Sequence, residues 1–283
     1  MTKILKGSEV VEDLNERISA QVEKLKSQNV QPALVIVRVG ERGDDISYER
    51  GATKRAEKLG VEVQSIVLPE SIETAELQEV ISKLNQNDEV HGVLMFRPLP
   101  KHIDEDLIRN TLAPQKDIDG ITDLSLAGVF SDTDTGFAPC TAQACMEILK
   151  HFNYDLKGKR AVVVGRSLVI GKPVAMLLLA EHATVTIAHS RTNDLPGTVK
   201  EADIVIACVG RAQMVDARYL SPGQVVIDVG INVMDDGALV GDVNAEEAEG
   251  IVEAITPVPG GVGTVTTSVL IQNVVQAASQ TVN

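Results

Sequence analysis

Residues 160–191 read RAVVVGRSLVIGKPVAMLLLAEHATVTIAHSR. The run Ala161-Val162-Val163-Val164 is typical of a strand buried on both faces, and a helical run follows from Val174 to Glu181. The turn between them is bounded by Gly165 and Gly171, and it reads G-x-S-x-x-x-G instead of G-x-G-x-x-G. A strand, a glycine-bounded turn and a helix form the first unit of a dinucleotide-binding fold, where backbone N–H groups hold a pyrophosphate.

The segments that follow support this interpretation. Apolar runs recur at Thr184–Ile187, Ile204–Ala207 and Val225–Asp228, each about 20 residues after the last. Such spacing is typical of βα units that build a parallel sheet. The sequence therefore predicts an α/β fold with a doubly wound, Rossmann-like domain in its second half.

The end of the second predicted strand indicates which nicotinamide cofactor is used. NAD-binding sites carry an acid there for the ribose 2′-hydroxyl, but this chain has His189-Ser190-Arg191. A hydroxyl and a guanidinium suit a 2′-phosphate, and Arg166 supplies a second guanidinium. The residues favour NADP(H). The alternatives are NAD(H) or an ordinary polar turn with one solvated arginine.

Composition excludes several classes of protein. The 283 residues carry a formal net charge of −14, which disfavours binding to nucleic acid or to an anionic membrane surface. Cys140, Cys145 and Cys208 have neither metal-ligand spacing nor an even count, so we expect reduced thiols, no metal and a cytoplasmic protein. We also expect no signal peptide and no membrane span.

The first half of the chain predicts a second α/β unit. A helical face from Val11 to Leu25 has Ser8 as its expected N-cap. The further expected elements are a strand at 33–39, a helix at 47–59, a strand at 63–68, a helix at 74–85 and a strand at 90–96. We expect loops and one short helix over 97–139, then a helix at 141–152. The last helix, at 266–278, could pack on either domain.

Four segments predict a substrate site. Tyr48 lies at the start of the second helix, and Arg97-Pro98-Leu99-Pro100 leaves a strand at its carboxyl end, where ligands bind in open α/β sheets. Asp117 and Asp119 share a turn, and residues 257–263 form a proline- and glycine-rich loop that lets backbone approach a ligand. Each segment alone also fits a surface aromatic, a turn or a connector.

Together these segments resemble the FolD family of methylenetetrahydrofolate dehydrogenase/methenyltetrahydrofolate cyclohydrolases. The resemblance runs nearly end to end and is most specific at residues 256–263. It implies an N-terminal α/β substrate domain at 1–140, a Rossmann-like NADP-binding domain at 141–283, and a cleft between them. The helix at about 266–283 would pack back on the first domain. The other matching segments are Val39-Gly40 with Tyr48, 116–120, 139–141, 164–173, 189–190, 229–232 and 241–243.

The resemblance also implies roles for single residues. Tyr48 and Asp119 would be catalytic, with Tyr48 beside the pterin and Asp119 accepting hydrogen bonds from its amino-pyrimidine edge. The other implied substrate contacts are Phe96, Pro98, Leu99, Pro259, Gly260 and Gly261. The implied cofactor contacts are Thr141, Gly165, Arg166, Ser167, Ile170, Ser190, Arg191, Val209, Gly210, Gly230 and Ile231. Tetrahydrofolate derivatives, NADP and a homodimer formed through the second domain are the implied partners.

The chain departs from the family pattern on its substrate side. Ala52 stands where the pattern has a lysine, on the same helical face as Tyr48. Lys54 lies six residues after Tyr48, about 120° away around the helix axis. Phe96 stands where the pattern has a glutamine. Hydride transfer chiefly requires two well-positioned ligands, whereas hydrolysis requires groups that move protons. The departures therefore predict a methylenetetrahydrofolate dehydrogenase that has lost the cyclohydrolase step.

Two alternatives stay open. The first is a bifunctional enzyme in which Arg97 or a repositioned Lys54 restores the proton relay. The second is a protein that binds folate and nucleotide without turnover. An assay of both reaction steps distinguishes all three.

Overall fold

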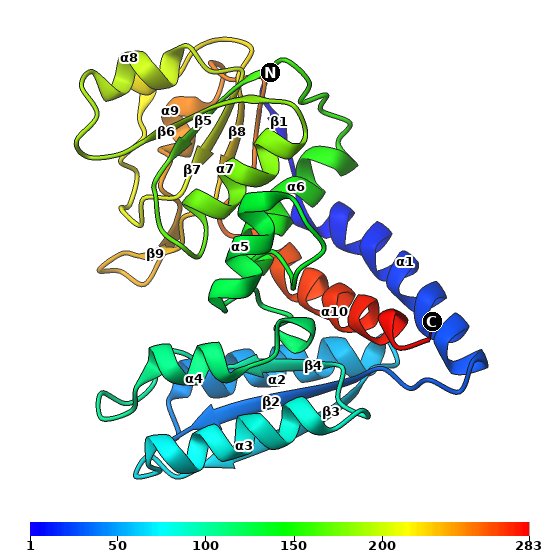
Figure 1. Ribbon diagram of the computed structural model, residues 1–283. Helices are drawn as coiled ribbons and strands as arrows, with labels where there is room; N and C mark the ends of the chain where they lie inside the picture. The colour runs from blue at the N-terminus through cyan, green and yellow to red at the C-terminus, as the bar shows by residue number, and fades with distance from the viewer. Residues whose placement is uncertain (283) are drawn as a thin grey trace. The chain divides into compact units, whose positions relative to one another are not determined.

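The computed structural model describes residues 1–282, which divide into two compact α/β units (Figure 1). The six-stranded unit comprises Met1–Glu12 and Thr141–Thr266, and the three-stranded unit comprises residues 13–140 and 267–282. The main sheet of each unit is parallel, which confirms the predicted fold class. Two long helices, α1 (Gly7–Ser27) and α10 (Val262–Gln280), contribute residues to both units.

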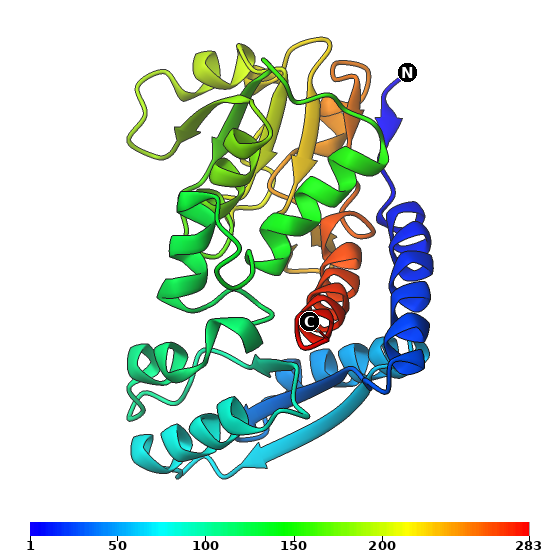
Figure 2. The ribbon, with the colours of Figure 1, turned by 45° about the vertical axis from the view of Figure 1, so that its right-hand side comes forward.

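The sheet of the six-stranded unit has the order β1-β11-β8-β7-β5-β6, with β1 and β6 at its edges (Figure 2). Its four longest strands, β5 to β8, lie where the apolar runs predict them. The two-residue strands β1 and β11 were not predicted, because so short a segment shows no periodicity. The bounds are β1 (Lys3–Ile4), β5 (Arg160–Val164), β6 (Thr184–Ala188), β7 (Ile204–Ala207), β8 (Val225–Asp228) and β11 (Ala254–Ile255).

Helices cover both faces of this sheet. Successive side chains of a strand point to opposite faces, and consecutive residues of β5, β7 and β8 are buried, so both faces are apolar and need cover. Val162 and Val164 join a buried cluster with Val199 and Ala248. Helix α7 packs against β5 and β6. The helical elements of the unit are α6 (Cys140–His151), α7 (Gly171–Ala180), α8 (Leu195–Lys200), η2 (Ala217–Tyr219) and α9 (Ala245–Ala248). A short hairpin is formed by β9 (Asn232–Val233) and β10 (Leu239–Val240).

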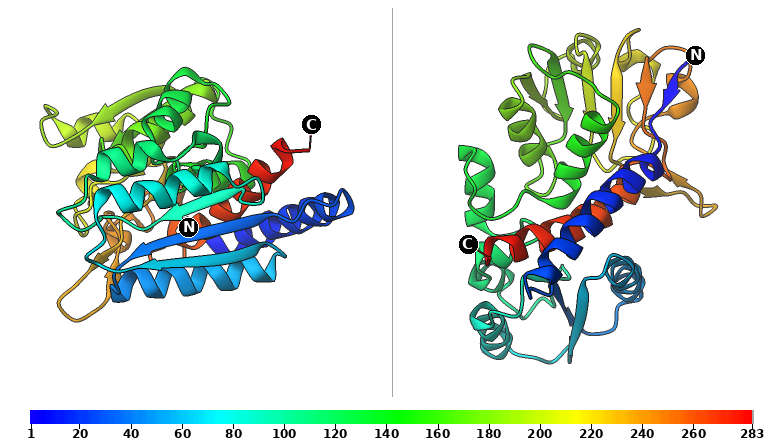
Figure 3. Two further views of the ribbon diagram at one scale, coloured as in Figure 1. Left: turned by 60° about the horizontal axis from the view of Figure 1, so that its bottom comes forward. Right: turned by 90° about the vertical axis from the view of Figure 1, so that its right-hand side faces the viewer.

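The three-stranded unit places β2 (Ala33–Val39) between β3 (Glu62–Leu68) and β4 (Gly92–Met95). Figure 3, left, shows helices on both sides of this sheet. One face carries Val35, Val37 and Val39, which pack with buried residues of α3 (Thr74–Gln86) and α4 (Glu105–Thr111). Helix α2 (Gly43–Lys58) packs against β3 through the opposite face. The predicted helix–strand alternation is present throughout.

Within this unit, α1 and α10 lie side by side (Figure 3, right). Gln21 Nε2 donates to Ser279 Oγ at 3.0 Å, and Ser268 Oγ donates to Asn15 Oδ1 at 3.1 Å. The prediction that Ser8 caps α1 is wrong, because the helix already begins at Gly7. The Gly7 N–H donates to the Gly260 carbonyl at 2.8 Å. This tertiary contact holds the chain at Gly7, the residue before Ser8, where the helix begins.

Further boundaries differ from the sequence prediction. Helices α7 and α10 begin at Gly171 and Val262, three and four residues before the predicted starts at 174 and 266. Helix α2 begins at Gly43 instead of 47, because Asp44 and Asp45 in its first turn favour a helix N-terminus. Tyr48 therefore lies in the second turn. The region 97–139 holds two α-helices, α4 and α5 (Asp123–Ser131), and the 3-10 helix η1 (Pro114–Lys116), where one short helix was expected. Thr122 caps α5 by accepting from the Ser125 N–H.

Among the helices of residues 1–282, none has both the length and the apolar character that crossing a membrane requires.

Candidate active site

The glycine-bounded turn after β5 is shaped by close backbone contacts. A Cβ on Gly165, whose φ is +138°, would lie 2.3 Å from the Cys208 carbonyl oxygen. A Cβ on Gly171 would lie 2.6 Å from the Gly165 carbonyl. The Ser167 hydroxyl accepts from the N–H groups of Ile170 at 3.2 Å and of Gly171 at 3.4 Å. The serine of the motif therefore fixes the turn against the N-terminus of α7, where an anion is favoured.

Two arginines lie at the sheet edge beside this turn. Because β5 and β6 are parallel neighbours, their carboxyl ends bring Arg166 to the same edge as Ser190 and Arg191. The Gly165 N–H donates to the Ala188 carbonyl at 2.9 Å and ties the two ends together. Both guanidiniums are exposed, and within residues 1–282 neither has a carboxylate partner. This donor chemistry fits a ligand phosphate.

A cavity of about 180 Å³ lies between two loops of the six-stranded unit. The turn after β8 contributes Gly230 and Ile231, and the loop before α10 contributes Pro259, Gly260 and Gly261. The structure therefore brings together residues that the sequence assigned separately to cofactor and to substrate. A Cβ on Gly263, in the first turn of α10, would lie 3.2 Å from Ile231 Cδ1, so the turn after β8 packs closely against the start of this helix.

The remaining predicted cofactor residues lie in the same unit. Thr141 is in the first turn of α6. Val209 and Gly210 follow β7, and their N–H groups donate to the buried carboxylate of Asp242, at 2.6 and 2.9 Å. Sequence reasoning missed Asp242, because its partners lie about 30 residues away in the chain. The backbone donors of the 208–211 turn are thus engaged by the protein itself.

On the three-stranded unit, Tyr48 and Phe96 form an aromatic pair. Their ring centroids are 5.8 Å apart and the rings are nearly perpendicular, at 84°. Tyr48 keeps 41% of its surface exposed, while its hydroxyl hydrogen-bonds Thr267 of α10. Burial of the hydroxyl raises the pKa of Tyr48 above its ordinary value, and the nearby Asp119 adds to this. Tyr48 therefore stays neutral and offers an accessible ring face.

The two acids of the 116–120 segment have different environments. Asp117 is fully buried and accepts hydrogen bonds from the N–H groups of Ile121 and Thr122, at 2.9 and 2.8 Å, and from the Ser125 hydroxyl. It stabilises the turn. Burial, and then the charge of Asp117, raise the pKa of Asp119 to about 6, although a hydrogen bond from Cys140 opposes this shift. Asp119 therefore titrates closer to neutral pH than an ordinary carboxyl group.

Cys140 lies directly against Asp119, and sequence reasoning gave it no role. Its thiol hydrogen-bonds the Asp119 carboxylate and also lies 3.2 Å from the Ile118 carbonyl oxygen. Asn273 donates to the same carbonyl at 2.9 Å. Burial raises the pKa of Cys140 well above its ordinary value, so the thiol stays protonated and acts as a hydrogen-bond donor.

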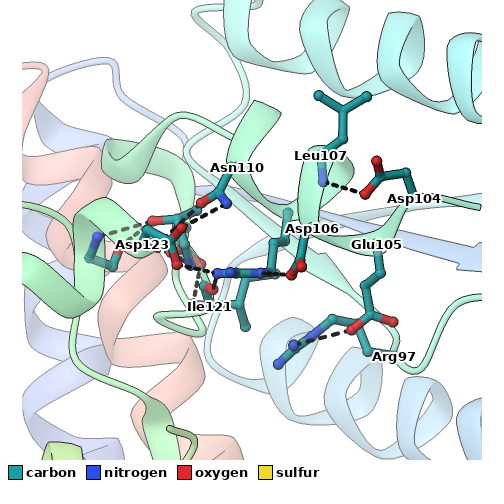
Figure 4. A network of polar contacts seen from close by, with 12 residues as sticks. Arg97, Asp104, Glu105, Asp106, Leu107, Asn110, Ile121 and Asp123 are labelled. Carbon is teal, nitrogen blue, oxygen red and sulfur yellow. Dashed lines mark hydrogen bonds and ion pairs between the residues drawn. The ribbon is translucent and has the colours of Figure 1, made fainter.

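The 97–99 segment is fixed by Glu105 at the start of α4. Arg97 Nη1 lies 3.6 Å from Glu105 Oε1 (Figure 4), and the Leu99 N–H donates to the other carboxylate oxygen at 2.8 Å. Leu99 is 8% exposed and its side chain belongs to the core, while Pro98 is exposed. Of the two predicted substrate residues in this segment, Leu99 therefore anchors the segment in the core, and Pro98 is the accessible one.

Ala52, at the position where the resemblance predicts a lysine, is 1% exposed. Lys54 lines a separate hollow of about 430 Å³, together with Arg38, Glu49 and Ser65. Neither Tyr48 nor Phe96 lines that hollow. Arg55 donates to Ser268 Oγ at 2.8 Å. Lys54 and Arg55 of α2 thus both have contacts away from the Tyr48–Phe96 pair.

Residues 1–282 contain no group of three His, Cys, Asp or Glu side chains placed to hold a metal ion.

Comparisons with known proteins cover nearly the whole chain. The family model described as tetrahydrofolate dehydrogenase/cyclohydrolase, catalytic domain, matches residues 5–119. The model for the NAD(P)-binding domain of the same family matches residues 139–282.

Among curated relatives, the bifunctional protein FolD of Clostridioides difficile is 49% identical over 275 residues, which are 97% of this chain and 96% of the relative. That of Carboxydothermus hydrogenoformans is 50% identical over 279 residues, covering 98% and 97%. Among solved structures, bifunctional FolD from Campylobacter jejuni superposes with a TM-score of 0.96 at 35% identity, covering 99% and 100% of the two chains. The Trypanosoma brucei enzyme, complexed with NADP and an inhibitor, gives 0.91 at 32%, covering 100% and 99%.

Proposed function

Because the chain belongs to the tetrahydrofolate dehydrogenase/cyclohydrolase family, we propose that it oxidises 5,10-methylenetetrahydrofolate with NADP⁺ and has largely lost the cyclohydrolase step. The observation that carries the second half of this proposal is the pair of apolar residues, Ala52 and Phe96, beside Tyr48. The first half rests on the intact cofactor turns and on Asp119.

The dehydrogenase step moves a hydride from the one-carbon bridge of the folate to NADP⁺, which supplies the acceptor carbon. The protein's contribution is positioning, which can lower a barrier by about 7–11 kcal/mol when the reacting groups are well aligned. Tyr48 and Phe96 offer aromatic surface to the pterin. The Asp119 carboxylate accepts two N–H groups from the amino-pyrimidine edge and so fixes the orientation of the ring.

NADP⁺ is the proposed cofactor because of the donors at the ends of β5 and β6. The turn from Gly165 to Gly171 would hold the pyrophosphate at the N-terminus of α7. Arg166, Ser190 and Arg191 would hold the 2′-phosphate, since no carboxylate stands among them to repel it.

Hydrolysis of the methenyl bridge requires a group that takes and returns a proton. Ala52 and Phe96 supply none. Arg97 faces Glu105, and a guanidinium does not release its proton in a protein. Lys54 lines the hollow on the other side of α2. The side chains around Tyr48 therefore favour hydride transfer over hydrolysis.

A bifunctional enzyme is the second candidate, favoured by the names of the Clostridioides difficile and Carboxydothermus hydrogenoformans relatives. In this chain the replacement for the lysine would be Asp119, whose pKa of about 6 suits proton transfer near neutral pH.

Direct assay of both steps tests the proposal. The protein is expected to reduce NADP⁺ with methylenetetrahydrofolate, while the decay of methenyltetrahydrofolate absorbance stays near the buffer rate. General acid–base assistance is worth about 10²–10⁴ in rate, so acceleration of about a hundredfold or more overturns the proposed loss. The double variant Ala52→Lys/Phe96→Gln is expected to gain hydrolysis.

Lys54→Ala is the matched control for this assay. Because Lys54 lines a different hollow, the variant is expected to keep both the dehydrogenase rate and the low hydrolysis rate of the parent. A fall in hydrolysis in Lys54→Ala would instead make Lys54 part of a rearranged relay and support the bifunctional candidate.

We also propose a cytoplasmic homodimer. Strand β6 is an edge strand of the six-stranded sheet, and exposed apolar side chains accompany it, with Ile187 on β6 and Leu179 on α7 at 37% and 54% exposure. These features fit pairing with a second copy. A reducing compartment suits the free thiols of Cys140, Cys145 and Cys208. Light scattering measures the mass in solution, and a monomer at assay concentration would contradict the dimer.

A further inference from the structure

Two buried carboxylates lie beneath the loops of the six-stranded unit. Asp242 has no exposed surface, and it accepts four hydrogen bonds. One oxygen accepts from the N–H groups of Val209 and Gly210, and the other accepts from the Arg211 N–H at 2.9 Å and from Asn232 Nδ2 at 3.0 Å. A single side chain thus joins the 208–211 turn to the 229–232 turn.

The second carboxylate, Asp228, holds the first in place. It is 3% exposed and accepts from the N–H groups of Gly230 at 3.0 Å, of Asp242 at 2.9 Å and of Val243 at 2.9 Å. The Asp228 N–H in turn donates to Thr256 Oγ1 at 2.8 Å, at the start of the 256–263 loop. Three loops that carry predicted site residues are therefore linked through two aspartates.

Two glycines permit this arrangement. A Cβ on Gly241 would lie 1.8 Å from Asp228 Oδ2, and a Cβ on Gly230 would lie 2.4 Å from the Asp242 carboxyl carbon. No larger residue fits at either position without displacing a carboxylate. The glycines of the 229–232 and 241–243 segments are thus required by the carboxylates behind the turns.

We propose that Asp242 is a positioning residue of the dehydrogenase, which holds the 208–211 and 229–232 turns in the shape that binds the cofactor. This rests on the proposed function, because the cofactor roles of Val209, Gly210, Gly230 and Ile231 are themselves proposed. Asp242 is buried behind the turns and acts through them.

All four groups facing the Asp242 carboxylate are N–H donors. Only the ionised form can accept from every one of them, because a protonated oxygen would place a hydrogen against an N–H. Charge-assisted bonds of this kind are about twice as strong as neutral ones, and losing the acceptor leaves buried amides unpaired.

The same contacts decide where the cofactor's phosphates bind. Converging backbone N–H groups commonly form anion sites. Here the N–H groups of Val209, Gly210 and Arg211 already bind an anion, the Asp242 carboxylate. The 208–211 turn therefore offers its outer surface to the cofactor and takes no phosphate, which leaves the pyrophosphate to the Gly165–Gly171 turn.

The test is Asp242→Asn, which keeps the shape of the side chain but turns one acceptor into a donor. A misplacement of about 1 Å can cost about a hundredfold in rate, so we expect the KM for NADP⁺ to rise about 10- to 100-fold. The KM for methylenetetrahydrofolate should stay within about twofold, and amide hydrogen exchange should accelerate at 209–211. Asp236→Asn, at the exposed tip of the β9–β10 hairpin, is the matched control and should keep parental values.

NADPH binding, followed by its fluorescence, separates failure of this proposal from failure of the proposed function. If the parent binds NADPH without turnover, the function is wrong, and the ratio of NADPH affinities between parent and variant still tests the positioning role. Faster exchange at 209–211 with unchanged NADPH affinity overturns the proposal. If Asp242→Asn does not fold, Asn232→Ala removes a single donor to Asp242 and should weaken NADPH binding by about threefold or more. Unchanged affinity in that variant overturns the proposal too.

Discussion

The two units carry candidate site residues of different kinds. In the six-stranded unit, the glycine turns and their backbone N–H groups predominate, and Ser167 and Asp242 hold their shape. The exposed side chains of Arg166, Ser190 and Arg191 stand beside them. In the three-stranded unit, the site consists of individual side chains, such as Tyr48, Phe96 and Asp119. A backbone site survives most substitutions, whereas one substitution can change the chemistry of a side-chain site without changing the fold.

The largest expected effect tests the side-chain half. Asp119→Ala removes the carboxylate that would accept two N–H groups of the pterin. Losing two charge-assisted hydrogen bonds should lower kcat/KM for methylenetetrahydrofolate by about 10²–10³. NADP⁺ affinity, measured by titration calorimetry, should stay near normal.

Asp117→Asn is unsuitable as a control for this variant, because Asp117 stabilises the turn itself. Asp123→Ala serves better, since Asp123 is exposed at the start of α5. Equal kcat/KM in parent and Asp119→Ala would reduce Asp119 to a turn residue and remove the contrast between the two units.

A smaller effect is expected at the sheet edge of the other unit. Arg166→Ala or Arg191→Ala should raise the KM for NADP⁺ about tenfold, because each loses one charge-assisted phosphate contact of about 1.5–3 kcal/mol. The KM for NAD⁺ should barely change. Arg218→Ala, which removes an exposed arginine paired with Asp216, is the control. A parent enzyme that prefers NAD⁺ would contradict the NADP assignment.

The pH dependence of folate binding tests the side-chain half further. Asp119 must be ionised to accept the pterin N–H groups, and its pKa is raised to about 6 by burial. The KM for methylenetetrahydrofolate should therefore rise as pH falls through about 6, by about tenfold for each further unit. Steady-state assays from pH 5 to 8 measure this. A flat KM across that range would contradict it.

The same contrast explains which parts of the fold could be predicted from the sequence. Long apolar runs such as 204–207 and 225–228 gave correct strands, because a buried parallel strand needs little beyond its own residues. The glycine turn after β5 was recognised from its spacing together with the apolar strand before it and the helix after it. The two-residue strands β1 and β11 were missed, since Lys3–Ile4 pairs with a segment about 250 residues away.

The sequence predicted the residues of the candidate site better than it predicted the contacts between them. Tyr48 and Phe96 were both identified, but their edge-on packing joins segments that only the fold brings together. Asp242 and Cys140 were missed as functional neighbours for a related reason. A buried carboxylate or thiol acquires its role from donors elsewhere in the chain, and one sequence contains no local signal of them.

The smallest expected effect concerns stability. Asp119 has an ordinary pKa of 3.8 when exposed and about 6 in the folded protein, so between these values the folded state takes up a proton that the unfolded state does not. Stability should therefore fall as pH rises from about 4 to about 6. Asp119→Asn does not lose stability in this way. The difference between its melting temperature and that of the parent should therefore increase from about pH 4 to about pH 6 and level off above pH 6.

The size of that gain is limited by solvent. The whole pKa shift corresponds to about 3 kcal/mol, but the side chain is only half-buried and its charge is partly screened, so about 1 kcal/mol is expected near pH 7. Calorimetric melting curves at pH 4, 5, 6 and 7 give the measurement, with Asp123→Asn as the exposed control. A variant that is more stable yet slower would mean that the chain keeps a destabilising carboxylate for the folate. A variant no more stable at pH 7 than at pH 4 would mean that the Cys140 hydrogen bond already offsets the cost of burying it.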